Sequence, residues 1–265
     1  MHKLQRKVRF SVNPFLPEDF TGFNSFSSKP SGEGLAVFFE LEVGLVGNLD
    51  RDTGFVVNVT DIDKCVREYV VPAFSERVRR HFRQAEHIGF SEIVELLKLT
   101  RDELAGKFGS AMVLELGLKL NPFRKLSVDC EDWKMIYFSE KFEFAAMHKL
   151  WNESFSEGRN HEVFGKCANP SGHGHNYVIE VSVKMPTEDN RFRIGNFQKI
   201  VDDALIQLID HKNLNADVAE FKDTNPTIEN IAVFAWNKLE GKFADSRLHC
   251  VNVWETDRTY CSYYG

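Results

Sequence analysis

The 265-residue chain lacks several features that would place it in a class at once. It has no C-x-x-C pair, and its five cysteines are too few for a disulfide framework in a chain of this length. No stretch approaches the roughly 20 apolar residues that cross a membrane, and the basic N-terminus has no apolar core of signal-peptide length. We therefore expect a cytoplasmic protein in a reducing compartment, with no membrane partner.

Basic residues are not in excess, because 33 Lys and Arg stand against 39 Asp and Glu, for a net charge of -6. Proteins that bind nucleic acid cluster Lys and Arg against phosphates, so we expect no nucleic-acid partner. The one basic run, at residues 76–84, suits a solvated helix face better than a phosphate patch, and we assign it no function. With 43% hydrophobic residues, the chain can bury the core of one large or two modest domains.

Strand signals dominate the start of the chain. An apolar run at 8–15 leads into a loop rich in Ser, Gly and Pro at 24–34. Two runs of β-branched and aromatic residues, at 35–46 and 55–59, flank a segment of strong turn formers and predict a β-hairpin. The last strand of this half is expected at 111–120.

Helix signals lie between these strands. Thr60 and Ser91 each precede apolar residues at helical spacing, so each is a candidate helix cap. Pro72 is expected to mark a break between helical segments.

The order of elements begins again near residue 134, which indicates an internal repeat. GEGLAVFFELEV at 32–43 aligns with GHGHNYVIEVSV at 172–183, at an offset of 140, and shares both glycines, the Glu and the apolar alternation that follows. We therefore expect two related α+β domains, at 1–133 and 134–265.

The repeat also shows a difference between the halves. In this alignment Glu33 and Leu35 stand where His173 and His175 stand, and Pro14 falls near the place of His148. The first domain therefore lacks these histidines, and we expect it to serve as scaffold or oligomer wall.

The histidines of the second half form a pattern that suits a metal. His173 and His175 are two residues apart, so in an extended segment they project from one face, and His148 lies on a separate apolar run. Neutral imidazoles suit zinc, and catalytic zinc sites commonly combine three protein ligands with one open position. The pattern favours a zinc site over ordinary hairpin histidines.

Cys167 lies six residues before His173 in a turn-forming segment, so it can stand near a metal without binding it. A thiolate favoured by nearby positive charge could act as a base or nucleophile, whereas an apolar setting would leave an inert thiol. The sequence leaves both interpretations open.

Two further positions in the second half carry ionisable side chains that are candidate site residues. Asp210 and His211, at the end of an amphipathic helix, are either a proton-carrying pair or a helix-end cap. Glu255 follows an alternating apolar run and points either into a pocket or to the surface.

Five motifs of the second half occur in the order found in the 6-pyruvoyl-tetrahydropterin synthases, which this half resembles. They are FAAMHKL (144–150), FGKCANPSGHGHNY (164–177), DHKN (210–213), PTIENIA (226–232) and ETD (255–257). The resemblance implies a T-fold, which is an antiparallel four-stranded sheet with helices packed on one face, here in two tandem copies. Subunits of that family associate into barrels, so a homo-oligomer is implied as well.

The resemblance implies a division of roles. Cys167 would be the base, with Asp210 and His211 completing a proton relay. Three residues would bind Zn2+: His148, His173 and His175. The implied reaction is a lyase reaction that eliminates triphosphate from 7,8-dihydroneopterin triphosphate and gives 6-pyruvoyl-tetrahydropterin.

Substrate contacts are implied in the same way. Glu255 would hold the pterin ring, while Thr227 and Glu229 would help line its pocket. Ile228 stands where relatives often carry a second Thr, which puts one pterin contact in doubt. The hairpin TEDNRFRIGN (187–196) lacks the family's usual T-G turn, which DRDTGFVVN (50–58) keeps.

Two alternatives remain at this point. A 6-carboxytetrahydropterin synthase of the queuosine pathway resembles this pattern in its zinc ligands and cysteine. The other alternative is a non-catalytic pterin-binding or assembly protein. Its best support is that the first half of the chain lacks the three histidines.

Overall fold

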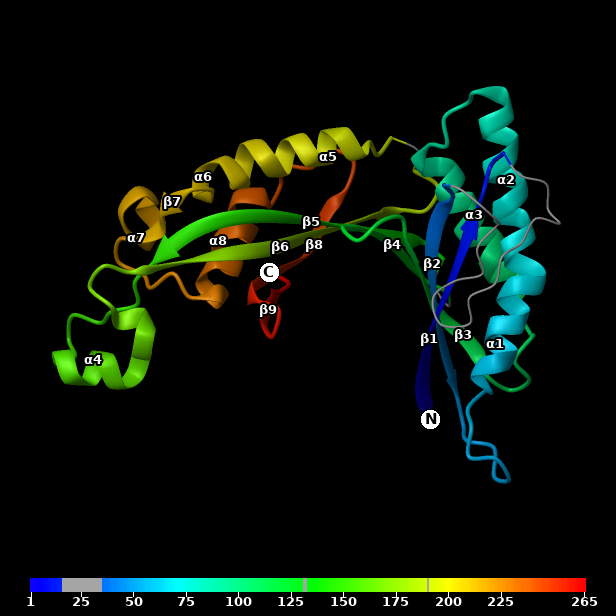
Figure 1. Ribbon diagram of the computed structural model, residues 1–265, viewed down its shortest axis with the longest axis horizontal. Helices are drawn as coiled ribbons and strands as arrows, with labels where there is room; N and C mark the ends of the chain where they lie inside the picture. The colour runs from blue at the N-terminus through cyan, green and yellow to red at the C-terminus, as the bar shows by residue number, and fades with distance from the viewer. Residues whose placement is uncertain (16–34, 131–132, 190) are drawn as a thin grey trace. The chain divides into compact units, whose positions relative to one another are not determined.

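The computed structural model describes residues 1–15, 35–130, 133–189 and 191–265 (Figure 1). The chain forms two compact units. Unit 1 is Met1–Phe138 with Pro186–Asn190, and unit 2 is Ser139–Met185 with Arg191–Gly265. Both units combine strands and helices, so the α+β class is confirmed. No helix among the described residues is both long and apolar enough to cross a membrane.

Unit 1 contains an antiparallel sheet in the order β1-β2-β3-β4. Its strands are β1 (His2–Val12), β2 (Val37–Gly47), β3 (Met112–Lys119) and β4 (Arg124–Asp129). Successive side chains of a strand alternate between the faces of the sheet, so one face of β2 is apolar and carries Phe39. The strand expected at 111–120 is confirmed as β3, whereas β4 was not expected.

Helices cover the apolar face of this sheet (Figure 1). They are α1 (Val59–Cys65), the π-helical turn η1 (Val66–Val70), α2 (Val71–Gln84) and α3 (Phe90–Leu104). Phe74 of α2 packs edge-on against Phe10 and Phe39, with ring centroids 5.3 and 5.2 Å away. These aromatic contacts fix the helix layer on the sheet.

Four expectations for this region are wrong. Ser91 is not a helix cap, because α3 begins at Phe90 and Gly89 is its N-cap. No second hairpin strand forms at 55–59, because α1 begins at Val59 and Asn58 caps it by accepting a hydrogen bond from the Thr60 N–H at 3.1 Å. Asn58 therefore replaces Thr60 as the cap. Helical backbone also continues through Pro72, which lies in the first turn of α2. A proline has no N–H to donate, and the π-helical turn η1 directly before α2 accommodates that missing bond.

The opposite face of β2 carries two buried carboxylates. Glu40 pairs with Arg9 at 2.7 Å and with Lys119 at 2.8 Å. Glu42 pairs with the Lys125 ammonium and more loosely with other lysines. Burial is the largest single effect and raises the pKa of Glu42, but the hydrogen bond from Lys125 and the charges of the nearby lysines together outweigh it and hold the pKa below its ordinary value. Both carboxylates are therefore buried together with opposite charge.

Unit 2 is built on a sheet in the order β5-β6-β8-β9. Its strands are β5 (Met135–His148), β6 (His173–Pro186), β8 (Arg247–Thr256) and β9 (Thr259–Tyr263). A fifth strand, the two-residue β7 (Lys212–Asn213), pairs with β5 in parallel. The expected four-stranded antiparallel sheet is thus extended by one short parallel strand.

The helices of unit 2 occupy three connections. Between β5 and β6 lie α4 (Glu157–Phe164) and the 3₁₀ turn η2 (Gly165–Ala168). After β6 come α5 (Ile194–Val201), the π-helical turn η3 (Asp202–Ile206) and α6 (Gln207–Ile209). Segment 187–196 therefore leads into a helix, and its interpretation as a hairpin is wrong.

The third connection, between β7 and β8, completes unit 2. It contains α7 (Leu214–Asp217), the 3₁₀ turn η4 (Ala219–Phe221) and α8 (Ile228–Leu239). Helix α8 packs on β8 and β9, where Trp236 meets Tyr263 edge-on with centroids 5.7 Å apart. This packing places the start of α8, and the loop before it, beside the end of β5.

Candidate metal centre

Three histidines converge where β5 ends and β6 begins. His148 is the last residue of β5, and His173 and His175 are the first and third residues of β6. One ring nitrogen from each lies within 4.8 Å of the others. Alternation along β6 gives the two β6 rings a common face, as the sequence spacing predicts. The cluster can hold a metal ion.

The ring of His148 is fixed by a backbone acceptor. Its Nδ1 lies 2.9 Å from the Pro226 carbonyl oxygen, and because a carbonyl only accepts, Nδ1 carries the proton. The Tyr177 hydroxyl lies 3.3 Å from the same nitrogen. The lone pair is therefore on Nε2, which lies 3.1 Å from Nε2 of His173. A metal-binding histidine typically donates its other N–H in this way.

The electrostatics of the cluster suit a cation. Burial lowers the pKa of His148, which is 1% exposed, and burial likewise lowers the pKa of His175. Both rings are therefore neutral near pH 7, which is the state that binds a metal. Nδ1 of His173 and Nε2 of His175 are buried without a hydrogen-bond partner. Since unpaired buried nitrogens are costly, the donor set fits a metal ligand role.

Cys167 lies in η2, next to the cluster. Its Sγ is 3.7 Å from Nε2 of His173, and its carbonyl oxygen accepts a hydrogen bond from the Leu150 N–H at 2.8 Å. Burial raises the pKa of this thiol, and the Glu255 carboxylate raises it further. The side chain is therefore a thiol near pH 7 when the histidines carry no cation.

Glu255 lies near the end of β8 and points to the cluster. Its Oε1 is 3.5 Å from Nε2 of His175 and 3.6 Å from Nε2 of His148. The side chain is 24% exposed. Of the two orientations that the sequence left open, the structure has the inward one.

Asp210 and His211 form the expected acid–imidazole pair. Asp210 Oδ1 accepts the Ala145 N–H at 2.9 Å and lies 2.9 Å from Nδ1 of His211. The hydrogen bond from Ala145 lowers the pKa of Asp210, so this group is a carboxylate near pH 7. The His211 ring is 81% exposed and lines a cavity of about 580 Å³ together with His175. His211 thus faces the same cavity as His175, and Asp210 holds the His211 ring from outside the cavity lining.

Thr227 and Glu229 are not brought to the histidines. Thr227 caps α8 by accepting the Asn230 N–H at 3.3 Å, and Glu229 is exposed in the first turn of that helix. Neither side chain lines the cavities beside the cluster. Their segment reaches the cluster through the Pro226 carbonyl.

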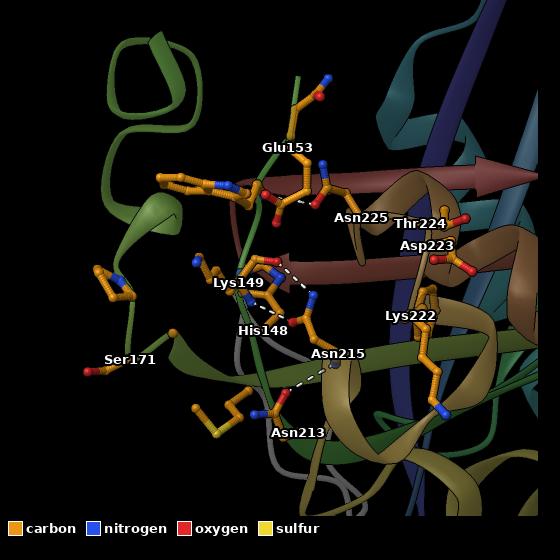
Figure 2. A pocket seen from close by; sticks show the side chains of 16 residues that line it. His148, Lys149, Glu153, Ser171, Asn213, Asn215, Lys222, Asp223, Thr224 and Asn225 are labelled. Carbon is orange, nitrogen blue, oxygen red and sulfur yellow. Dashed lines mark hydrogen bonds between the residues drawn. The ribbon is translucent and has the colours of Figure 1, made fainter. Parts of the chain in front are cut away.

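A second cavity, of about 570 Å³, opens beside His148 and is rich in asparagine (Figure 2). Asn215 and Asn225 contribute to its wall, and both hydrogen-bond to the backbone that follows His148. The sequence analysis missed these residues. The sequence offered one weak signal: Asn215 lies just after the motif DHKN, and Asn225 lies just before the motif PTIENIA. Position next to a motif does not indicate which backbone groups a side chain contacts.

Comparisons with known proteins agree on the second half of the chain. Residues 137–265 match the family model described as 6-pyruvoyl tetrahydropterin synthase. The 6-pyruvoyl tetrahydrobiopterin synthase of Homo sapiens is 38% identical over 130 residues, which are 48% of this chain and 90% of that protein. The 6-carboxy-5,6,7,8-tetrahydropterin synthase of Aquifex aeolicus is 27% identical over 156 residues, covering 47% of this chain and 95% of that protein. The solved 6-pyruvoyl tetrahydropterin synthase of Caenorhabditis elegans is 34% identical, covers 49% of this chain and 96% of its own, and has a TM-score of 0.46.

Proposed function

The chain belongs to the 6-pyruvoyl tetrahydropterin synthase family and is a lyase, and on that premise we propose a zinc-dependent reaction. The substrate is 7,8-dihydroneopterin triphosphate, and the product is 6-pyruvoyl-tetrahydropterin with release of triphosphate. One observation carries the proposal: three imidazole nitrogens within 4.8 Å of one another, with a thiol 3.7 Å from one of them.

The metal ligands are His148, His173 and His175. The protonated Nδ1 of His148 and the unpaired Nε2 of His175 support this assignment, as does Nε2 of His173, which lies 3.1 Å from Nε2 of His148. When bound, zinc supplies Lewis-acid polarisation of the hydroxyls on the substrate side chain. His148 and His175 hold neutral lone pairs ready for it, because burial disfavours their charged forms.

Proton transfer falls to Cys167, Asp210 and His211. Cys167 lies beside the ligand set and outside it, so its sulfur is free to remove a proton from the substrate side chain. The Asp210 carboxylate accepts the Nδ1 proton of His211, which leaves the other ring nitrogen to exchange a proton with substrate or solvent.

The pterin ring is oriented by Glu255. A carboxylate accepts hydrogen bonds from the amino and N–H groups of a pterin, and the inward orientation of Glu255 supports this role. Thr227 and Glu229 would act from the first turn of α8. They do not line the cavities beside the histidines, so a contact from them requires the bound pterin to extend to the start of α8.

The alternative is 6-carboxytetrahydropterin synthesis. It is supported by the Aquifex aeolicus relative, which is matched over 95% of its length, but that relative is 27% identical where the human 6-pyruvoyl enzyme is 38% identical. The pyruvoyl product is therefore the first proposal.

The test is incubation of the zinc-loaded protein with 7,8-dihydroneopterin triphosphate, with the product identified by mass. Release of triphosphate with a 6-pyruvoyl product supports the proposal, and a 6-carboxy product supports the alternative. A protein that binds zinc and the pterin without releasing triphosphate is a non-catalytic binder, and both lyase proposals fail. His173→Ala, prepared in the same way, is the matched inactive control.

We further propose that the protein works as a cytoplasmic homo-oligomer built from T-fold barrels. All five cysteines are free, which supports a reducing compartment. Light scattering of the active protein tests the assembly, and a monomer with full activity contradicts it.

A further inference from the structure

The four residues after His148, at 149–152, have left the strand, yet their backbone is held by bonds from elsewhere. Every buried backbone N–H and C=O needs a partner, and here asparagine side chains supply several of them. We propose that three asparagines form a clamp that positions His148 relative to Cys167. The asparagine clamp consists of Asn160, Asn215 and Asn225. This inference rests on the proposed function, since it takes His148 and Cys167 as site residues.

Asn215, on α7, holds the residue next to the metal ligand. Its Oδ1 accepts the Lys149 N–H at 2.7 Å, and its Nδ2 donates to the Lys149 carbonyl at 2.9 Å. The two bonds replace those that a neighbouring strand would make. Asn215 is itself held, because its N–H donates to Oδ1 of Asn213 at 3.1 Å, as Figure 2 shows. The backbone direction immediately after His148 is therefore fixed.

Asn225 has two effects on His148. Its Oδ1 accepts the Trp151 N–H at 2.9 Å, which ties the loop before α8 to the chain after the ligand. The next residue, Pro226, contributes the carbonyl that accepts the Nδ1 proton of His148. Asn225 therefore keeps in place the acceptor that sets the His148 tautomer.

Asn160, on α4, connects the same stretch to the helical connection that carries Cys167. Its Oδ1 accepts the Asn152 N–H at 2.8 Å, and its Nδ2 donates to the Asn152 carbonyl at 3.0 Å. Between these anchors, the Leu150 N–H donates to the Cys167 carbonyl at 2.8 Å. The ligand and the candidate base are thus tied through one short segment.

The clamp also explains the cavity of Figure 2. A wall rich in asparagine resembles a binding site for a polar ligand. The bonds of Asn215 and Asn225, however, already go to the backbone of residues 149–151. We therefore assign these amides a positioning role.

The test uses variants on two different elements, so that it survives if one variant fails to fold. Asn215→Ala and Asn225→Ala remove clamp bonds. Asn225→Asp keeps an acceptor for the Trp151 N–H and should restore wild-type behaviour. Asn237→Ala, at an exposed asparagine of α8, is the matched control.

Three quantities are measured: zinc affinity by competition with a chelator, the absorption spectrum of the cobalt-substituted protein, and thermal stability. Both alanine variants should bind zinc about 10-fold more weakly, the size of effect expected for partners outside the ligand set, and should show altered cobalt spectra. Asn225→Asp and Asn237→Ala should match the wild type. Turnover should show a lower kcat with little change in KM.

The outcomes separate the two proposals. Folded alanine variants with wild-type zinc affinity and cobalt spectrum overturn the clamp, even if they are less stable, and leave the proposed function standing. A wild-type protein that binds neither zinc nor cobalt overturns the metal centre, and the clamp with it.

Discussion

The two units share an order of elements and differ in what their strand ends carry. In each, two long strands are followed by a helix, a π-helical turn and a second helix. Where β5 ends and β6 begins, unit 2 has His148 and His173; where β1 ends and β2 begins, unit 1 has Val12 paired with Val37. The same order of elements thus places histidine ring nitrogens at the strand ends of unit 2 and an apolar valine pair at those of unit 1.

The positions of unit 1 that align with His173 and His175 in the repeat test this difference only in part. Leu35, which aligns with His175, is 94% exposed and precedes β2. Glu33, which aligns with His173, lies outside the described residues. The site is therefore absent from the described part of unit 1, and the role of that unit as scaffold or oligomer wall stays a prediction.

The units also bury polar groups in different ways. Unit 1 pairs Glu40 and Glu42 with cations across neighbouring strands. Unit 2 leaves Nδ1 of His173 and Nε2 of His175 without a hydrogen-bond partner, and both belong to a cluster of three histidines. Buried nitrogens of unit 1 without a hydrogen-bond partner belong to Arg67 and His81, which are not part of such a cluster. Because an unpaired buried polar atom costs free energy, it survives where a ligand or metal repays that cost. The comparison therefore favours unit 2 as the place of a metal site, because among the described residues its unpartnered nitrogens lie in a histidine cluster.

Removal of the candidate base should give the largest effect. Cys167→Ala should lower turnover by about 1,000-fold, the scale of general acid–base catalysis. Zinc content should not change, since the sulfur lies outside the ligand cluster. Steady-state rates and metal analysis check this, and undiminished turnover would contradict the mechanism.

Zinc should stabilise unit 2 and leave unit 1 unaffected. A ligand at 100 times its Kd stabilises the state that binds it by about 2.7 kcal/mol. Hydrogen exchange with and without a chelator should show zinc-dependent protection in β5 and β6, with none in β1 and β2. Equal protection of all four strands would show that the metal site is not confined to unit 2.

Glu42→Gln should act on unit 1 alone. Loss of hydrogen bonds to a charged partner costs about 2 kcal/mol, so the free energy of unfolding should fall by that amount at pH 7. The folded-state pKa of Glu42 is below its ordinary value of 4.5, so its contribution is present above pH 4.5 and is lost as the pH falls further. Denaturant titrations should therefore show the variant and the wild type converging in acid. A change in zinc affinity at pH 7 would contradict the separation of the units.

The smallest effect compares one helix cap from each unit. Asn58→Ala and Thr227→Ala should each cost about 1 kcal/mol of stability, because each removes a cap bond. Only Thr227→Ala should also raise KM for the pterin, since its segment is proposed to line the pocket. Thr227→Ser keeps the cap hydroxyl and controls for lost stability. Unchanged KM in Thr227→Ala would remove Thr227 from the pocket.

Much of the site was readable from local spacing. The two-residue interval between His173 and His175 predicts a shared face on a strand, and the structure has that face. The inward direction of Glu255 was not readable, because it depends on where β8 lies beside β6. The prediction that 55–59 pairs with 35–46 as a hairpin failed for a related reason. Turn residues predict that the chain reverses direction, but they do not predict which strands pair, and the neighbours of β2 are β1 and β3.

The sequence by itself determined the α+β class and the family and indicated the candidate site residues, because periodicity and motif spacing are local properties of the chain. Only the tertiary structure decided how those residues meet. It set the proton of His148 through the Pro226 carbonyl, 78 residues away, and brought Asn215 and Asn225 to the backbone after that histidine. Contacts between segments so distant along the chain depend on packing, which no local pattern encodes.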